Sequence, residues 1–113
     1  MIQNMQAEII PGNMTIAEWS LKEAEDIVRS VCADIGVRVI LFGSRARGTH
    51  RIFSDIDIAL DGMGEQLPSN LYGELGERFE NSLIPYTVDV VDLIDTTDEF
   101  RRQVYDEGIV WMP

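Results

Sequence analysis

Apolar residues recur along this chain with two different periods. Up to about residue 35, apolar residues recur every three or four positions, which predicts an amphipathic helix with the stripe Ala24, Ile27, Val28, Val31 and Ile35. Ser20-Leu21-Lys22-Glu23 has the pattern of a capping box for its start, with Thr15-Ile16-Ala17-Glu18 as an earlier alternative. Gly36 stands where a glycine commonly ends a helix.

Shorter and more continuous apolar runs follow. Residues 37–42 and 53–60 predict two strands, separated by a turn or a single helical turn at residues 43–48. A helix opening at Pro68 carries the stripe Leu71, Tyr72, Leu75, Phe79 and Leu83. Residues 86–93 predict a third strand, Thr96 and Thr97 cap a last helix that ends near Gly108, and residues 109–111 add a short strand. The expected fold class is α/β (α+β), a small mixed β-sheet with helices packed on one face.

Composition is that of a globular domain, with 45% hydrophobic and 26% charged residues in 113. We expect one domain over residues 1–113, with residues 1–14 as a loose N-terminal arm. No apolar run approaches the ~18 residues of a membrane span, and the start lacks the pattern of a signal peptide. Together with the single cysteine, Cys32, these features favour the cytoplasm and no membrane.

Charge adds a second constraint. The formal net charge is −11, which argues against stable binding to a long nucleic acid, because such binding depends on Lys and Arg neutralising phosphates. The loop after Ser44 is an exception, since it gathers Arg45, Arg47, His50 and Arg51. A basic loop in an acidic chain favours a small anionic ligand such as a nucleoside triphosphate. The alternative is a solvated loop with ordinary surface ion pairs.

The second predicted strand contains two candidate catalytic residues. Asp55 and Asp57 are two positions apart, so their carboxylates project from one face, while Ile56, Ile58 and Leu60 occupy the other. The third strand carries Asp89 and Asp92, and one of these can join the pair. Two carboxylates ~4 Å apart repel by roughly 4 kcal/mol at an effective dielectric constant near 20. A bound cation would offset that repulsion, and Mg²⁺ prefers oxygen ligands of this kind.

Gly43 and Ser44 are candidates for binding a phosphate group next to these carboxylates. Glycine lets a phosphate approach the backbone without a Cβ in the way, and Ser44 offers a hydroxyl and a backbone N–H at the start of a short helix. Carboxylate-held metal that faces a phosphate-holding turn is the layout of a two-metal phosphoryl- or nucleotidyl-transfer site.

These residues resemble a known family. Gly43-Ser44, ten residues, then Asp55-Ile56-Asp57 is similar to the signature of the DNA polymerase beta nucleotidyltransferase superfamily. The segment Leu41-Phe42-Gly43-Ser44-Arg45-Ala46-Arg47-Gly48 resembles the corresponding segment of the superfamily's smallest members, the minimal nucleotidyltransferases. The likeness runs from about residue 31 to residue 110 and implies a polymerase-beta-type nucleotidyltransferase fold.

The resemblance implies a role for each matching residue. Gly43 and Ser44 would hold the triphosphate of ATP or another nucleoside triphosphate, and Asp55 and Asp57 would bind two Mg²⁺ ions. In that family a third acidic residue lies in a segment like residues 85–92. By this resemblance, Asp89 would be the third catalytic carboxylate and a metal ligand. Asp92 is an odd number of positions away, on the opposite face of the strand. Arg45 and Arg47 would contact phosphate, unless they form surface ion pairs.

The resemblance also implies an activity and a partner. Minimal nucleotidyltransferases are typically paired with a small helical protein of the HEPN fold, as antitoxin of a toxin–antitoxin module, and some transfer AMP to the toxin. Larger relatives append an acceptor domain for which 113 residues leave no room, so we expect the acceptor hydroxyl to come from another chain, in a homo- or hetero-oligomer. The alternatives are a catalytically weak nucleotide-binding module that neutralises its partner by contact, and a small-molecule nucleotidyltransferase.

Two apolar segments are candidates for the contact surface with such a partner. One is the tail, residues 109–112, and the other is the N-terminal arm with Ile9, Ile10, Met14 and Trp19. The alternative is that both segments only cover the sheet edge and the core.

Overall fold

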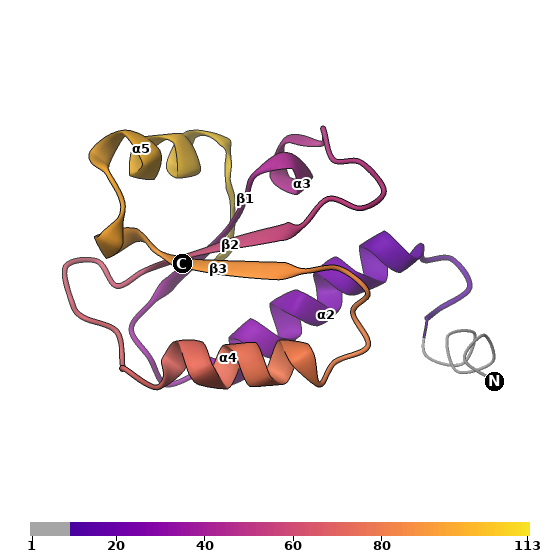
Figure 1. The fold of residues 1–113 in the computed structure, drawn as a ribbon, viewed down its shortest axis with the longest axis horizontal. Coiled ribbons are helices and arrows are strands. Elements are labelled where there is room, and N and C mark those ends of the chain that lie inside the picture. Colours follow the sequence, from indigo (N-terminus) through magenta and orange to yellow (C-terminus); the bar gives the residue numbers. More distant parts are fainter. Residues whose placement is uncertain (1–9) are drawn as a thin grey trace.

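The structure is a computed structural model that describes residues 10–113, and it is built around a four-stranded β-sheet (Figure 1). In chain order the elements are α2 (Ile16–Val31), β1 (Arg38–Phe42), α3 (Ser44–Arg47), β2 (Ile56–Asp61), α4 (Leu71–Glu80), β3 (Val88–Asp92), the 3-10 turn η1 (Leu93–Asp95), α5 (Asp98–Glu107) and β4 (Ile109–Met112). Each helix and strand that the sequence predicts is therefore present. The predicted α/β fold class with a small mixed sheet is confirmed.

The strands lie in the order β3-β2-β1-β4. β1 pairs antiparallel with β2 and β4, whereas β2 and β3 run parallel. A parallel pair needs a crossover connection, and α4 provides it. The apolar tail becomes β4 at one edge of the sheet, with Trp111 buried but Ile109 and Val110 half exposed. This position agrees with the interpretation that the tail covers the sheet edge.

Helix α2 begins at the earlier of the two predicted capping boxes. Thr15 Oγ1 accepts the backbone N–H of Glu18 at 3.1 Å, and the Glu18 carboxylate accepts the N–H of Thr15 at 3.4 Å. Ser20 lies buried inside the helix instead. Because α2 begins at Ile16, Trp19 lies within the helix and on its buried face. A start after Ser20 would have left Trp19 outside the helix.

Side chains on the two faces of the sheet pack against different helices. On β2, Ile56, Ile58 and Leu60 are fully buried in the cluster formed with α2 and α4. Ala59 points to the opposite face, where it packs with Ile40, Leu93 and Val104.

Helix α5 therefore covers part of the second face, as Figure 1 shows by placing it across the sheet from α2 and α4. The expectation that helices pack on one face holds for α2 and α4 and needs this correction for α5. The reason is that apolar Ile40 and Ala59 share the face of the aspartates and require cover of their own.

Of the predicted N-terminal arm, residues 1–9, and with them Ile9, lie outside the described residues. Residues 11–14 form a turn that leads into α2, closed by a hydrogen bond from the N–H of Met14 to the carbonyl of Pro11 at 3.0 Å. Within residues 10–113, every helix is too short or too polar to cross a bilayer.

Candidate active site

Gly43 connects β1 to α3 and lies against the carboxylate of Asp57. Its φ of +76° belongs to the left-handed region, which residues with a side chain rarely adopt. A Cβ at this position would overlap Oδ2 of Asp57 and approach its Cγ to 3.2 Å. Position 43 therefore requires glycine for two reasons, backbone conformation and space, and the second reason ties the turn directly to an acid of the predicted site.

Asp57 and Asp89 are neighbours across the parallel strands β2 and β3. They are register partners, so their side chains share the sheet face that α5 partly covers. Asp55 immediately precedes β2 and is exposed. Asp92 lies on the other face, where its Oδ1 accepts the N–H of Ile94 at 3.1 Å and so caps η1. The structure thus brings Asp89, and not Asp92, beside Asp57: strand parity placed the two on opposite faces, and the family resemblance nominated Asp89.

The three carboxylates are close enough to influence one another's ionisation. Burial raises the pKa of Asp57, and the negative charges of Asp89 and Asp55 raise it further, while Arg47 opposes the shift. Burial, followed by the charge of Asp55, raises the pKa of Asp89. The site therefore carries more negative charge than its surroundings compensate, which favours either a proton or a cation.

The chemistry of this donor set fits a hard divalent cation, since carboxylate oxygens are the ligands that Mg²⁺ prefers. Across residues 10–113, no group of three or more Asp, Glu, His or Cys side chains already stands in metal-binding geometry. Asp55, Asp57 and Asp89 would therefore have to rotate their carboxylates toward a common point to hold an ion.

The two predicted phosphate-binding arginines have different surroundings. Arg45 is only 6% exposed. Its Nε and Nη2 donate to the carbonyl of Ser54 at 3.1 and 2.8 Å, and its guanidinium lies 4.2 Å from the centroid of the Tyr86 ring. Arg45 thus fastens the end of the loop that leads into Asp55.

Arg47 is the last residue of α3 and is exposed. Its Nη1 donates to Oε2 of Glu107 at 3.0 Å, and its charge lowers the pKa of Asp57. Of the two arginines, Arg47 is the one that both solvent and the carboxylates can reach.

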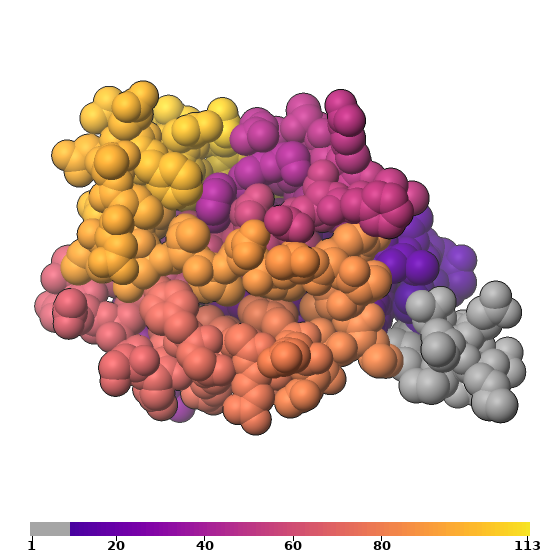
Figure 2. Space-filling model, in the orientation of Figure 1, coloured from indigo at the N-terminus to yellow at the C-terminus, as the bar shows by residue number. Residues whose placement is uncertain are grey.

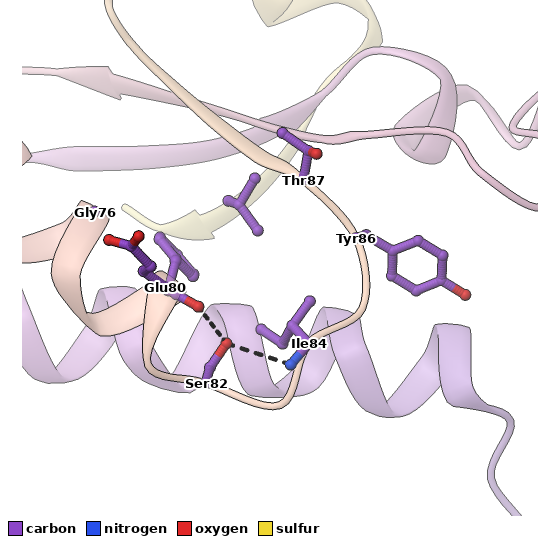
Figure 3. Close-up of a pocket in the computed structure, with 8 residues that line it drawn as sticks. Gly76, Glu80, Ser82, Ile84, Tyr86 and Thr87 are labelled. Atoms are coloured by element: carbon purple, nitrogen blue, oxygen red, sulfur yellow. Dashed lines mark hydrogen bonds between the residues drawn. The ribbon is translucent and has the colours of Figure 1, made fainter.

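A cavity of about 360 Å³ opens between the end of α4 and the segment that enters β3 (Figure 3). In it, Ser82 Oγ donates to the carbonyl of Phe79 at 2.6 Å and accepts the N–H of Ile84 at 3.3 Å, which holds the turn after α4. None of the predicted site residues lines this cavity. One of its lining residues, Tyr86, also contacts the guanidinium of Arg45.

A smaller cavity of about 190 Å³ opens beside the Gly43 turn. Gly43 and Arg47 line it on one side and α5 lines it on the other. Figure 2 shows the surface on which these segments meet, with the yellow residues of α5 and the magenta residues of the α3 loop side by side above the orange band of β3.

Sequence reasoning did not identify three residues that shape this site. Ser54 and Tyr86 hold Arg45, and Glu107 pairs with Arg47. Glu107 is 60 positions from Arg47 in the chain, so no local pattern could have paired them. Ser54 could have been noticed as the residue before Asp55, but its contribution is a backbone carbonyl, for which residue type carries no signal.

Comparison with known proteins agrees with this geometry. Residues 34–112 match the family described as polymerase beta, nucleotidyltransferase. A curated protein of Haemophilus influenzae named "Probable protein adenylyltransferase MntA" is 37% identical over 97 residues, which cover 80% of this chain and 84% of that protein.

Two solved structures share the fold. One, of a proposed minimal nucleotidyltransferase, superimposes with a TM-score of 0.64 at 30% identity, over 88% of this chain and 98% of that one. The other is a toxin–antitoxin crystal structure with AMP-PNP, with a TM-score of 0.60 at 29% identity, over 77% of this chain and 71% of that one. The chain belongs to the polymerase beta nucleotidyltransferase family and is a homologue of the minimal nucleotidyltransferase MntA.

Proposed function

We propose that this protein transfers AMP from ATP to a hydroxyl group of a partner protein, and that it serves in this way as the antitoxin of a toxin–antitoxin pair. The observation that carries the proposal is the placement of Asp57 and Asp89 side by side, with the carboxylate of Asp57 against Gly43. This arrangement supports the proposal because it puts the Gly43 turn, to which we assign phosphate binding, and a pair of acids at one point of the sheet.

Each residue has a role that follows from its position. The Gly43 backbone and Ser44 bind the triphosphate, and Arg47 adds a positive charge on the same side. Asp55, Asp57 and Asp89 would hold Mg²⁺ in a two-metal site. Arg45 does not reach the phosphates in this proposal, because its Nε and Nη2 are engaged by Ser54; it positions Asp55 instead.

Bound Mg²⁺ would neutralise charge on the triphosphate and lower the pKa of the attacking hydroxyl. The acceptor oxygen forms a bond to the α-phosphorus, and the bond from that phosphorus to the bridging oxygen of the β-phosphate breaks, so that pyrophosphate leaves. Asp89 lies on the side of Asp57 away from Gly43, and its carboxylate takes the proton of the hydroxyl.

Three comparisons support the choice of substrate and partner. The curated homologue is named as a protein adenylyltransferase, and one structural relative was crystallised as a toxin–antitoxin with AMP-PNP. A further toxin–antitoxin structure, MntA-HpeT at 27% identity and a TM-score of 0.59, carries two aspartate-to-glutamate changes two positions apart, which is the spacing of Asp55 and Asp57. We propose a helical HEPN-type protein as partner in a hetero-oligomer in the cytoplasm.

The decisive experiment asks whether the partner is modified. The chain is incubated with the product of the neighbouring gene, with Mg²⁺ and ATP, and the intact mass of that candidate partner is measured together with its toxicity on expression. Asp57→Asn removes one carboxylate of the site, and Asp34→Asn makes the same charge change at an exposed position beyond α2.

We expect a gain of one adenylyl group on the partner with the unmodified chain and with Asp34→Asn, and none with Asp57→Asn. Loss of toxicity should follow the mass gain. If Asp57→Asn silences the partner as well as the unmodified chain does, without any mass gain, the protein is a nucleotide-binding module that acts by contact and the enzyme proposal is wrong.

A further inference from the structure

The turn between α3 and β2 exposes two large apolar side chains. Among residues 10–113, Phe53 and Ile52 are the most exposed of the large apolar residues, at 87% and 75%. They belong to the loop that projects beyond the end of the sheet after α3 (Figure 1). Turns form most readily with Gly, Pro, Asn, Asp and Ser, so this turn does not need apolar side chains in order to form. Burial of the pair requires a second surface.

Hydrogen bonds on both sides fix the backbone of this turn. The N–H of Ser54 donates to the carbonyl of Arg51 at 3.0 Å, and Ser54 Oγ accepts the N–H of Arg51 at 2.8 Å. The buried guanidinium of Arg45 donates to the Ser54 carbonyl and lies on the ring of Tyr86. A surface whose backbone is already held loses less conformational freedom when a partner covers it. The turn is therefore preorganised for contact.

The turn also lies next to the acids of the site. Phe53 is two residues from Asp55, so their Cα atoms are at most about 7 Å apart. Just beyond Asp55, the N–H of Ile56 donates to the carbonyl of Thr87 at 2.9 Å, which joins this part of the chain to the segment that enters β3. A protein surface that covers Phe53 is thus brought beside the carboxylates, where the proposed transfer needs an acceptor hydroxyl.

Charge limits the kind of surface that fits this turn. Residues 43–54 contain three arginines and no acidic residue, whereas the whole chain has a formal net charge of −11. Arg47 and Arg51 are exposed within that segment. An acidic patch on a partner is attracted to these arginines and repelled by the negative charge of the rest of the chain. The same net charge disfavours an anionic membrane, the other surface that suits an apolar turn flanked by arginines.

We propose that the turn at residues 51–54 is the docking element for the protein that carries the acceptor hydroxyl. Phe53 and Ile52 fill an apolar notch on that protein, and Arg51 pairs with acidic side chains at the rim of the notch. The inference rests on the proposed nucleotidyl transfer and specifies how its protein substrate is held. This contact surface differs from both apolar segments that the sequence suggested, the tail and the N-terminal arm.

Steady-state transfer to the product of the neighbouring gene tests the docking turn. The KM for that protein and the KM for ATP are measured separately, with Mg²⁺ present. We expect the double variant Ile52→Ser, Phe53→Ser to raise the KM for the protein by about 30-fold, as loss of an aromatic hot spot does, and to leave the KM for ATP unchanged. Its melting temperature should stay close to that of the unmodified chain, because both side chains are exposed.

Two controls separate docking from general effects of surface substitution. Met63→Ser removes a side chain that is 51% exposed beyond the opposite end of β2 from Asp55, and it should change neither KM. Arg51→Glu should raise the KM for the protein about 10-fold, whereas Arg78→Glu, the same charge change at an exposed position of α4, should not. A rise in the KM for ATP alone with Arg51→Glu would overturn the assignment of Arg51 to the rim of the notch.

The outcomes distinguish the docking turn from the proposed function. If the double variant and Met63→Ser have the same KM for the protein, the turn does not dock it, although nucleotidyl transfer still stands. If the unmodified chain transfers nothing, the proposed function fails, and calorimetric binding of the same protein decides the docking turn. The docking inference is then wrong if the unmodified chain does not bind that protein, or if the double variant binds it equally tightly.

Two measurements on the chain alone test other occupants of the turn. Sedimentation velocity reports self-association, and flotation with vesicles of equimolar phosphatidylcholine and phosphatidylserine reports membrane binding. We expect the double variant to behave like the unmodified chain in both. If only the unmodified chain dimerises or floats, the turn contacts a second copy or a membrane, and its assignment to the protein substrate is overturned.

Discussion

Gly43 lies so close to Asp57 that a methyl group on its Cα would overlap the Asp57 carboxylate. Gly43→Ala should therefore push Asp57 out of position as well as strain the backbone. We expect a loss of about 1 kcal/mol in the free energy of unfolding from the positive φ. Transferase activity should fall by about 100-fold, because small displacements of catalytic groups are costly. Urea unfolding followed by circular dichroism and a transfer assay measure the two effects.

Gly48→Ala is the matched control for this substitution. Gly48 has the same φ of +76°, but an added Cβ there meets nothing within 4 Å. It should lower stability by a similar amount and leave activity within about 3-fold. Equal activity losses in the two variants would show that contact with Asp57 is not what position 43 requires.

Asp57→Asn should stabilise the protein while abolishing transfer. Burial and the neighbouring carboxylates hold the pKa of Asp57 above its ordinary value of 3.8, so the ionised carboxylate destabilises the fold at neutral pH. For a carboxyl group with a raised pKa, this penalty is absent well below pH 3.8 and complete above the folded-state pKa. Because Asp57 keeps part of its surface exposed to solvent, we expect the melting temperature at pH 7 to rise by only a few degrees.

The measurement is a thermal melt of both proteins from pH 3 to pH 8, with and without Mg²⁺ and ATP. The advantage of Asp57→Asn should disappear at acid pH, and ligand should raise the melting temperature of the unmodified chain alone. An Asp57→Asn variant less stable than the parent at pH 7 would contradict uncompensated repulsion among the acids.

Arg45 and Arg47 should respond differently to replacement by lysine. Arg45→Lys loses the paired hydrogen bonds to Ser54 and the planar contact with Tyr86, which should cost about 1–2 kcal/mol of stability. Arg47→Lys breaks only an exposed ion pair and should cost less than about 0.5 kcal/mol, yet it should weaken ATP binding severalfold. Urea unfolding and calorimetry separate the two. Arg47→Lys as the more destabilising substitution would reverse our assignment of roles.

Tyr105 should contribute a pH-dependent part of the stability. Burial raises the pKa of Asp61, but hydrogen bonds from the Tyr105 hydroxyl and the Met63 N–H, with the charges of Arg101 and Arg38, outweigh burial and bring the pKa below 3.8. Such a carboxylate stabilises the fold above pH 3.8, and the contribution is lost as the pH falls through the lower folded-state pKa.

Tyr105→Phe should therefore lower the free energy of unfolding by about 1 kcal/mol between pH 5 and pH 8. The difference should shrink below pH 3.8. Urea midpoints at pH 7 and pH 3, for Tyr105→Phe, Asp61→Asn and the double variant, provide the measurement. Additive effects of the two substitutions at pH 7 would show that Tyr105 and Asp61 are not coupled.

Local geometry made much of this protein predictable. The 3.6-residue period of α2 and the strand alternation that places Asp57 opposite Ile56 and Ile58 are properties of neighbouring residues, and the structure confirms both elements. Strand β2 begins at Ile56, however, so Asp55 lies one residue before the strand that was predicted to contain it. Strand parity likewise separated Asp89 from Asp92 before any strand pairing was known.

Contacts between residues far apart in the chain could not be predicted from local sequence. Two interpretations of Arg45 and Arg47 were open, and nothing near either residue distinguished an arginine buried on Tyr86 from one that faces solvent. The same holds for α5, whose apolar residues predicted a buried face without saying which side of the sheet they would bury against.

By itself, the sequence determined the helices and strands, the shared face of Asp55 and Asp57, and the glycine turn ahead of them, because each depends on backbone geometry over a few residues. Only the tertiary structure decided that Asp89 stands beside Asp57, that Asp57 presses on Gly43, and that Glu107 reaches Arg47. Those contacts join segments 14 to 60 positions apart, and their formation depends on how sheet and helices bury one another's apolar faces.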